Sequence, residues 1–251
     1  MKIYIGVCAF KKRYYSSPIR CVELQRTFYN IPQEKTVKKW RDEAPKDFVF
    51  NIKVFQGLTH DAKSPTWRRY TKKLSSKEKE LVGNLRLNDL TKGWIRTYIR
   101  FAKILDAEVL IVQTSARFSP TKENIENAKK FFQYCMSVLD EEKVKTWIGW
   151  EPRGKWLENT SKLREIIEEF DRLIHIVDPF FHKPVTIKKV VYFRLHGKPY
   201  LNYKYQYTDN ELRDLANKVE GLPAEKAYFM FNNVYMEEDA QKFARIIGEK
   251  Q

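Results

Sequence analysis

Eight short apolar segments, rich in β-branched and aromatic residues, recur along the 251-residue chain and restrict its fold more than any other feature. Most intervals between them carry the apolar periodicity of amphipathic helices, and Thr208 with Glu211 forms a capping-box pattern ahead of one such interval. Alternating strands and helices with nearly continuous hydrophobic strands indicate a parallel sheet covered by helices. The predicted strands are residues 2–7, 21–25, 48–54, 108–113, 146–151, 172–177, 190–195 and 227–232.

Eight such units in a chain of this length predict an α/β fold of the (β/α)8 TIM-barrel type, formed as a single domain over residues 1–251. An open doubly wound sheet is the alternative, but neither GxGxxG nor a GKT or GKS motif follows the first strand. The interval 178–189 is short and broken by proline, so we expect the helix after the sixth strand to be missing. The interval 55–107 is long enough for an inserted helical segment.

Polar side chains stand at or just after the end of almost every predicted strand. In "YFRLHG" (192–197), Arg194 and His196 are two residues apart on an apolar strand, so both project to one face. Active sites of (β/α)8 barrels lie at the carboxyl ends of the strands, so we expect a polar pocket there. Its members by this argument are Cys8, Glu23, Gln25, Lys53, Gln113, Glu151, Asp178, Arg194, His196, Asn232 and Asn233.

The chain is strongly basic, with a net charge of +15. Nearly all the excess lies in the segments that would follow the strands on the pocket face, and aromatic residues such as Trp156 are interleaved with these cations. Basic residues with aromatic platforms favour a polyanion such as DNA or RNA, or a phosphorylated small molecule.

The cysteines and the hydropathy of the chain suggest an ordinary cytoplasmic location. Three cysteines without a CxxC spacing indicate neither a disulfide framework nor a zinc knuckle. No apolar run approaches the roughly 18 residues of a membrane helix, so no membrane partner is expected.

Several motifs together resemble the DUF72 (YecE-like) family, whose members are TIM barrels without a settled activity. They are "IGVCAF" (5–10), "VELQRTFYNIP" (22–32), "FVFNIKVFQGLTH" (48–60), "GWEPRGKW" (149–156), "VDP" (177–179), "YFRLHG" (192–197) and "YFMFNN" (228–233). The resemblance implies a family pocket around Glu23, Tyr29, Lys53, His60, Glu151, Arg153, Asp178, Arg194, His196, Asn232 and Asn233.

Two readings of these polar residues remain open. As a functional site, the catalytic candidates are Glu151, His196, Asp178 and His60, which could transfer protons or hold one divalent metal ion. The substrate-binding candidates are Arg194, Arg153, Lys53, Glu23, Tyr29, Gln113, Asn232, Asn233 and Trp156. As a structural plug, Glu151 would pair with Arg194 and Glu23 with Lys53, and the pairs would only rigidify the barrel mouth.

The function predicted first is action on a phosphate-bearing substrate or nucleic acid, by a hydrolase or lyase type of chemistry if the protein is an enzyme. A barrel that binds nucleic acid without chemistry is the alternative from another class. A sugar isomerase or hydrolase, using Glu151 and Asp178 as its carboxylates, is the third, although such an enzyme does not require a charge of +15.

Overall fold

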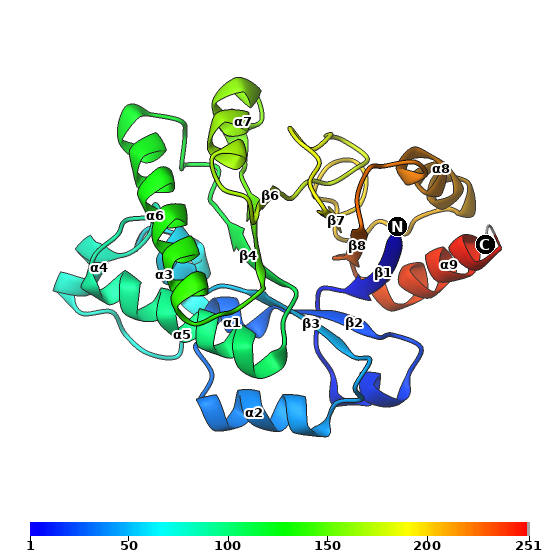
Figure 1. The fold of residues 1–251 in the computed structure, drawn as a ribbon, viewed down its shortest axis with the longest axis horizontal. Coiled ribbons are helices and arrows are strands. Elements are labelled where there is room, and N and C mark those ends of the chain that lie inside the picture. The colour runs from blue at the N-terminus through cyan, green and yellow to red at the C-terminus, as the bar shows by residue number, and fades with distance from the viewer. Residues whose placement is uncertain (250–251) are drawn as a thin grey trace. The chain divides into compact units, whose positions relative to one another are not determined.

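A computed structural model describes residues 1–249, in which every predicted strand segment contains a strand and helices lie between most of them (Figure 1). The strands are β1 (Lys2–Val7), β2 (Cys21–Leu24), β3 (Val49–Lys53), β4 (Val109–Gln113), β5 (Trp147–Glu151), β6 (Leu173–His175), β7 (Val190–Leu195) and β8 (Lys226–Phe231). The α-helices are α1 (Arg26–Tyr29), α2 (Glu34–Glu43), α3 (Gln56–Thr59), α4 (Ser76–Leu81), α5 (Asp89–Leu105), α6 (Lys122–Glu141), α7 (Thr160–Glu168), α8 (Asp209–Val219) and α9 (Met236–Gly248). Short 3-10 turns occur at η1 (Lys12–Ser16), η2 (Pro65–Arg69) and η3 (Gly154–Trp156).

The strands form one parallel sheet in the order β6-β5-β4-β3-β2-β1-β8-β7. Just after β6, Val177 forms a parallel bridge with Phe193 of β7, which nearly closes the sheet into a barrel. The predicted (β/α)8 fold class is therefore confirmed. Residues 176–189, all of them described, contain no helix, as the proline-broken interval predicts.

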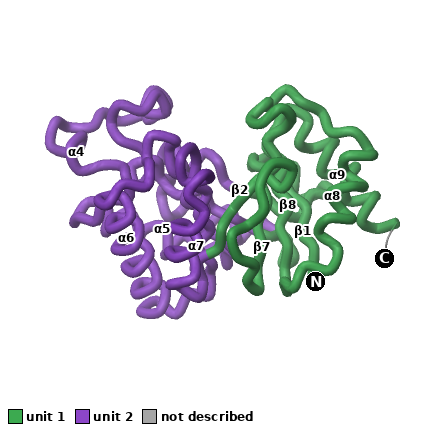
Figure 2. Tube along the Cα trace, turned by 90° about the horizontal axis from the view of Figure 1, so that it is seen from above, with its two compact units in different colours: residues 1–23, 45–49, 174–251 green, residues 24–44, 50–173 purple. Residues whose placement is uncertain are grey.

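The chain divides into two compact units, which Figure 2 shows in different colours. Unit 1 contains residues 1–23, 45–49 and the described chain from 174 onward, and unit 2 contains residues 24–44 and 50–173. Three of the four boundaries fall inside strands β2, β3 and β6, and the fourth follows α2. The one-domain organisation stays a prediction.

In unit 1, strands β2, β1, β8 and β7 pair in that order and are packed by aromatic rings. Tyr228 stacks between Tyr4 and Tyr192, with ring centroids 4.8 and 5.6 Å apart. The capping box predicted at Thr208 and Glu211 is present and starts α8, whose buried Leu212, Leu215, Ala216 and Val219 form its apolar face.

In unit 2, β4 (VLIVQ) is buried along its whole length, as expected of a central parallel strand. Asn88 and Thr121 cap the two long helices α5 and α6 by accepting hydrogen bonds from backbone N–H groups in their first turns. The region 55–107 contains α3, η2, α4 and α5, so the predicted helical insertion is present.

Candidate functional site

Arg194 on β7 and Glu23 on β2 form a fully buried ion pair in unit 1. The guanidinium donates through Nε and Nη2 to both carboxylate oxygens of Glu23, each at 3.0 Å, and the Tyr192 hydroxyl donates to the same carboxylate at 2.9 Å. Arg194 therefore binds the Glu23 carboxylate in a bidentate manner. The role of Arg194 in binding a ligand stays a prediction.

His196 and Asp178 lie beside this pair. His196 Nε2 is 3.3 Å from Arg194 Nη1, and the His196 backbone N–H donates to Asp178 Oδ2 at 2.9 Å. Asp178 Oδ1 also accepts from the backbone N–H of Phe180. Asp178 thus fixes the turn after β6 and joins it to the end of β7.

Gly197 ends the strand-seven motif with a positive φ of 87°, where an added Cβ would collide with the backbone oxygen of Asn202. Its backbone N–H donates to the Tyr207 hydroxyl. The sharp turn away from β7 therefore requires a glycine.

The two asparagines after β8 differ in environment. Asn233 is buried, and its Nδ2 donates to the Tyr205 carbonyl oxygen at 2.7 Å and to Asp239 Oδ2 at 2.6 Å. Asn232 is half-buried, and its backbone N–H donates to Leu195 O. The contacts of Asn233 hold the loop before α8 against the start of α9.

In unit 2, Lys53 ends β3 and is almost completely buried. Its ammonium donates to Gln113 Oε1 at 2.6 Å and lies 4.3 Å from the ring centroid of Phe28 on α1. The backbone of Lys53 is held as well, because Thr27 Oγ1 donates to Lys53 O. A strand, a helix and a neighbouring amide thus position this cation.

His60 follows α3 and packs edge-on against Phe28, with Thr59 Oγ1 2.8 Å from its Nδ1. Burial, then the charge of Lys53, and then that of Arg153 lower the pKa of His60 to about 3. The imidazole is therefore neutral at physiological pH.

Glu151 and Arg153 form an ion pair at the end of β5, with Arg153 Nη2 3.1 Å from Glu151 Oε1. In the β4–β5 register, Glu151 stands opposite Gln113. Trp156 is fully buried between Phe118 and Trp150, with ring centroids 5.9 and 4.9 Å away. Trp156 therefore packs the loop after β5.

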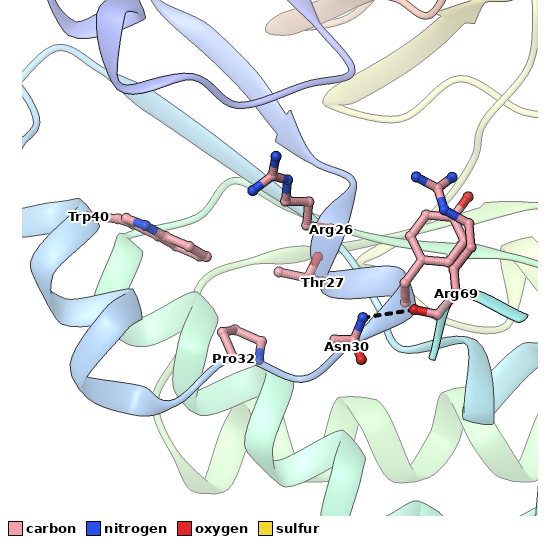
Figure 3. Close-up of a pocket in the computed structure, with 7 residues that line it drawn as sticks. Arg26, Thr27, Asn30, Pro32, Trp40 and Arg69 are labelled. Carbon is pink, nitrogen blue, oxygen red and sulfur yellow. Dashed lines mark hydrogen bonds between the residues drawn. The ribbon is translucent and has the colours of Figure 1, made fainter. Parts of the chain in front are cut away.

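Tyr29 lies elsewhere in unit 2, in a surface pocket lined by Arg26, Thr27, Asn30, Pro32, Trp40 and Arg69 (Figure 3). Neither Arg26 nor Trp40 is among the site residues predicted from the sequence. Arg26 stands inside the "VELQRTFYNIP" motif, and Trp40 is an aromatic residue among the charged residues of α2, so both signals were present.

The predicted site residues come from both units. Unit 1 contains Glu23, Asp178, Arg194, His196, Asn232 and Asn233, and unit 2 contains Tyr29, Lys53, His60, Gln113, Glu151, Arg153 and Trp156. Within the units, Arg194 pairs with Glu23 and Arg153 pairs with Glu151. The structural plug stays a prediction.

Residues 1–249 contain no group of three or more His, Cys, Asp or Glu side chains placed to hold a metal ion. The four residues considered as ligands divide between the units, with Asp178 and His196 in unit 1 and His60 and Glu151 in unit 2. Within the same described range, no helix is long and apolar enough to span a membrane.

Several cations of the strand-end loops are paired with carboxylates. Glu237 accepts hydrogen bonds from Lys11 at 2.6 Å and from Arg13 at 2.6 and 2.8 Å, and Lys198 pairs with Glu211 at 2.7 Å. The basic segment 63–73 of unit 2 differs, since none of its five cations forms an ion pair with a residue that the structure describes; they are Lys63, Arg68, Arg69, Lys72 and Lys73.

A sequence profile of the family described as "Protein of unknown function DUF72" matches residues 10–250. The chain belongs to the DUF72 family. A DUF72 protein of Enterococcus faecalis is 21% identical with a TM-score of 0.72, and the match covers 98% of both chains. A DUF72 protein of Thermotoga maritima is 20% identical with a TM-score of 0.65, covering 99% of this chain and 100% of that one.

The other similar proteins give less information about this chain, because the match is short or the sequence identity is low. The UPF0759 protein YunF of Bacillus subtilis is 41% identical over 49 residues, which are 20% of this chain and only 17% of that protein. A D-tagatose 3-epimerase-like protein is 16% identical with a TM-score of 0.59 over 100% of this DUF72 chain and 99% of its own. That likeness shows the fold alone.

Proposed function

We propose that this DUF72 protein binds a small phosphate-bearing substrate at the carboxyl ends of β3, β4 and β5, and that Glu151 transfers a proton on it. The observation that carries the proposal is the environment of His60. Besides burial, the cations Lys53 and Arg153 both lower the pKa of this imidazole, so the charges of both act at the same buried side chain. Buried positive potential at barrel strand ends suits an anionic substrate group.

Each residue has a distinct role in this proposal. Lys53, oriented by Gln113, attracts the phosphate, and Arg153 offers the planar fork that matches phosphate oxygens. A substrate that engages Arg153 competes with Glu151 for its guanidinium, and Glu151 is the carboxylate beside it that accepts a proton from the substrate. His60 serves as a neutral hydrogen-bonding group.

The burial of these side chains favours a small substrate over a nucleic acid at this site. Lys53, Gln113 and Glu151 are each less than a tenth exposed. Duplex phosphates are spread along a wide surface and would not reach them.

The sugar isomerase or hydrolase alternative has less support. The likeness to epimerase-like and isomerase-domain structures concerns the fold. Asp178, one of the two carboxylates such chemistry would use, is engaged in turn contacts with the backbone of Phe180 and His196.

Calorimetric titration with ribose 5-phosphate and with ribose tests the proposal. We expect the wild type to bind the phosphorylated sugar, and Lys53→Met and Arg153→Gln each to weaken binding about tenfold or more. Arg117→Gln is the matched control, because this exposed arginine of unit 2 forms no ion pair with any described residue. Thermal melts establish that the variants are folded.

A second experiment detects phosphate binding in the wild-type protein, without a substitution. A bound phosphate offsets the positive charges around His60, so its pKa should rise on binding, as followed by NMR of the imidazole ring. Equal affinity of Lys53→Met and Arg117→Gln, or an unchanged His60 titration at saturating ribose 5-phosphate, would contradict the proposal.

A further inference from the structure

The surface pocket of unit 2 shown in Figure 3 is not part of the strand-end cluster and has a volume of about 380 Å³. Pockets that hold small ligands range from about 300 to 1,000 Å³. Its lining combines two arginines, Arg26 and Arg69, with the aromatic rings of Tyr29 and Trp40.

Hydrogen bonds fix the position of Arg69 at this pocket. Asn30 Nδ2 donates to Arg69 O at 3.0 Å, the dashed line in Figure 3, and Asn30 Oδ1 accepts from the backbone and hydroxyl of Thr71. The Arg69 guanidinium lies 4.0 Å from the ring centroid of Tyr29. Tyr29 is held in turn, because Gln56 Nε2 donates to Tyr29 O at 3.3 Å.

The two guanidinium groups are available to a ligand. Arg26 and Arg69 are exposed, and neither forms an ion pair within residues 1–249. Further along the chain, Lys72 and Lys73 are exposed as well. An anion at this pocket would displace no carboxylate.

The opposite wall of the pocket is apolar. The indole of Trp40 extends from α2 toward the side of α1 that carries Arg26 and Thr27, and Pro32 lies below it (Figure 3). A ligand with a planar ring could stack its ring on the indole of Trp40 while an anionic substituent binds the guanidinium groups.

We infer that this pocket binds a nucleotide unit, with the base stacked on Trp40 and the phosphate bound by Arg26 and Arg69. Base–aromatic stacking tolerates any sequence, and arginine forks match phosphate geometry. The unit can come from a free nucleotide or from a single-stranded nucleic acid, since both present the same base and phosphate.

This site is independent of the proposed substrate site. α1 separates the two, because Phe28 contacts Lys53 and His60 while Arg26 and Tyr29 line the pocket. Titrations are therefore run in the wild type and in Lys53→Met, so that a ligand bound at the strand ends is recognised.

Calorimetry with AMP, adenosine, inorganic phosphate and a single-stranded hexa-deoxyadenylate tests the inference. AMP should bind at least about tenfold more tightly than adenosine or phosphate, and equally well to Lys53→Met. Arg26→Gln and Arg69→Gln should each weaken AMP binding about tenfold, whereas Arg117→Gln should leave it unchanged. Trp40→Leu should remove the advantage of AMP over phosphate, and Trp40→Phe should retain most of it.

The two sources give different results. Comparable affinity for AMP and the hexanucleotide identifies a free-nucleotide site, whereas binding of the hexanucleotide alone, weakened by Arg69→Gln and not by Arg117→Gln, identifies a strand-binding site. The inference is wrong if AMP binds no better than phosphate while the hexanucleotide fails to bind. It is also wrong if Arg26→Gln and Arg69→Gln weaken ligand binding no more than Arg117→Gln does.

Discussion

At the scale of single residues, the environment of His60 has a consequence for the response to acid. Its pKa falls from 6.5 to about 3 through burial and through the charges of Lys53 and Arg153. In the unfolded chain the same group protonates near pH 6.5, so below that pH the unfolded state binds more protons than the folded state. Stability due to the neutral imidazole is therefore present above pH 6.5 and lost as the pH falls from there toward 3.

We expect His60→Gln to flatten this dependence. Between pH 6.5 and pH 5 the wild type should lose about 2 kcal/mol of unfolding free energy through His60, on the scale of about 1.4 kcal/mol per pH unit. Urea unfolding of both proteins at the two pH values measures the difference. His182→Gln is the control, since His182 is only half-buried. Parallel pH profiles for the wild type and His60→Gln would contradict the burial argument.

At the scale of elements, Arg194 and Glu23 tie together strands that are not neighbours in the sheet. β2 and β7 are separated by β1 and β8, yet the pair forms two hydrogen bonds of 3.0 Å with both side chains fully buried. Such a buried pair adds little to the free energy of unfolding when it is compared with apolar residues at both positions. Removal of one partner, however, leaves a buried charge without compensation.

Arg194→Met should therefore destabilise the protein by about 3–5 kcal/mol, because the buried Glu23 carboxylate loses the guanidinium that pairs with it. Arg213→Met removes an exposed arginine that pairs with Glu249 at 2.9 Å and should cost no more than about 1 kcal/mol. Chemical unfolding measures both. The double variant Arg194→Met with Glu23→Leu should recover much of the stability. A stable single variant with altered ligand binding would instead support the role in substrate binding predicted from the sequence.

At the scale of the whole molecule, the cations behind the net charge of +15 differ in whether they are paired with carboxylates. Lys11 and Arg13, near the first strand, share the single carboxylate of Glu237, whereas Lys63, Lys72 and Lys73 form no ion pair among the described residues. Any binding of single-stranded nucleic acid should therefore depend mainly on Lys63, Lys72 and Lys73.

The salt dependence of oligonucleotide binding measures this distribution. Replacement of Lys63, Lys72 and Lys73 by Gln should reduce the slope of log affinity against log salt by about 2, because each neutralised phosphate of a single strand contributes about 0.7 to that slope. Replacement of Lys11 and Arg13 by Gln should reduce the slope by no more than about 0.7, because the carboxylate of Glu237 already offsets one of their two charges. Fluorescence anisotropy over a salt series gives both slopes, and equal slopes for the two variants would contradict the assignment.

The sequence by itself determined the order of strands and helices, the capping of α8, the missing helix before β7 and the family. Each of these depends on periodicity, on turn residues or on contiguous motifs, and such signals are local in the chain. Strand alternation also predicted that polar groups would stand at the carboxyl ends of the strands.

Only the tertiary structure decided which of these charges neutralise one another and where a pocket remains. Glu23 and Arg194 are 171 residues apart, and Arg13 and Glu237 are 224 apart, so no local pattern encodes their pairing. Arg26, Trp40 and Arg69 come from α1, α2 and η2 and share a pocket because Asn30 fixes Arg69 beside α1. Ion pairs and pockets depend on distances between side chains from separate elements, and those distances are set by packing.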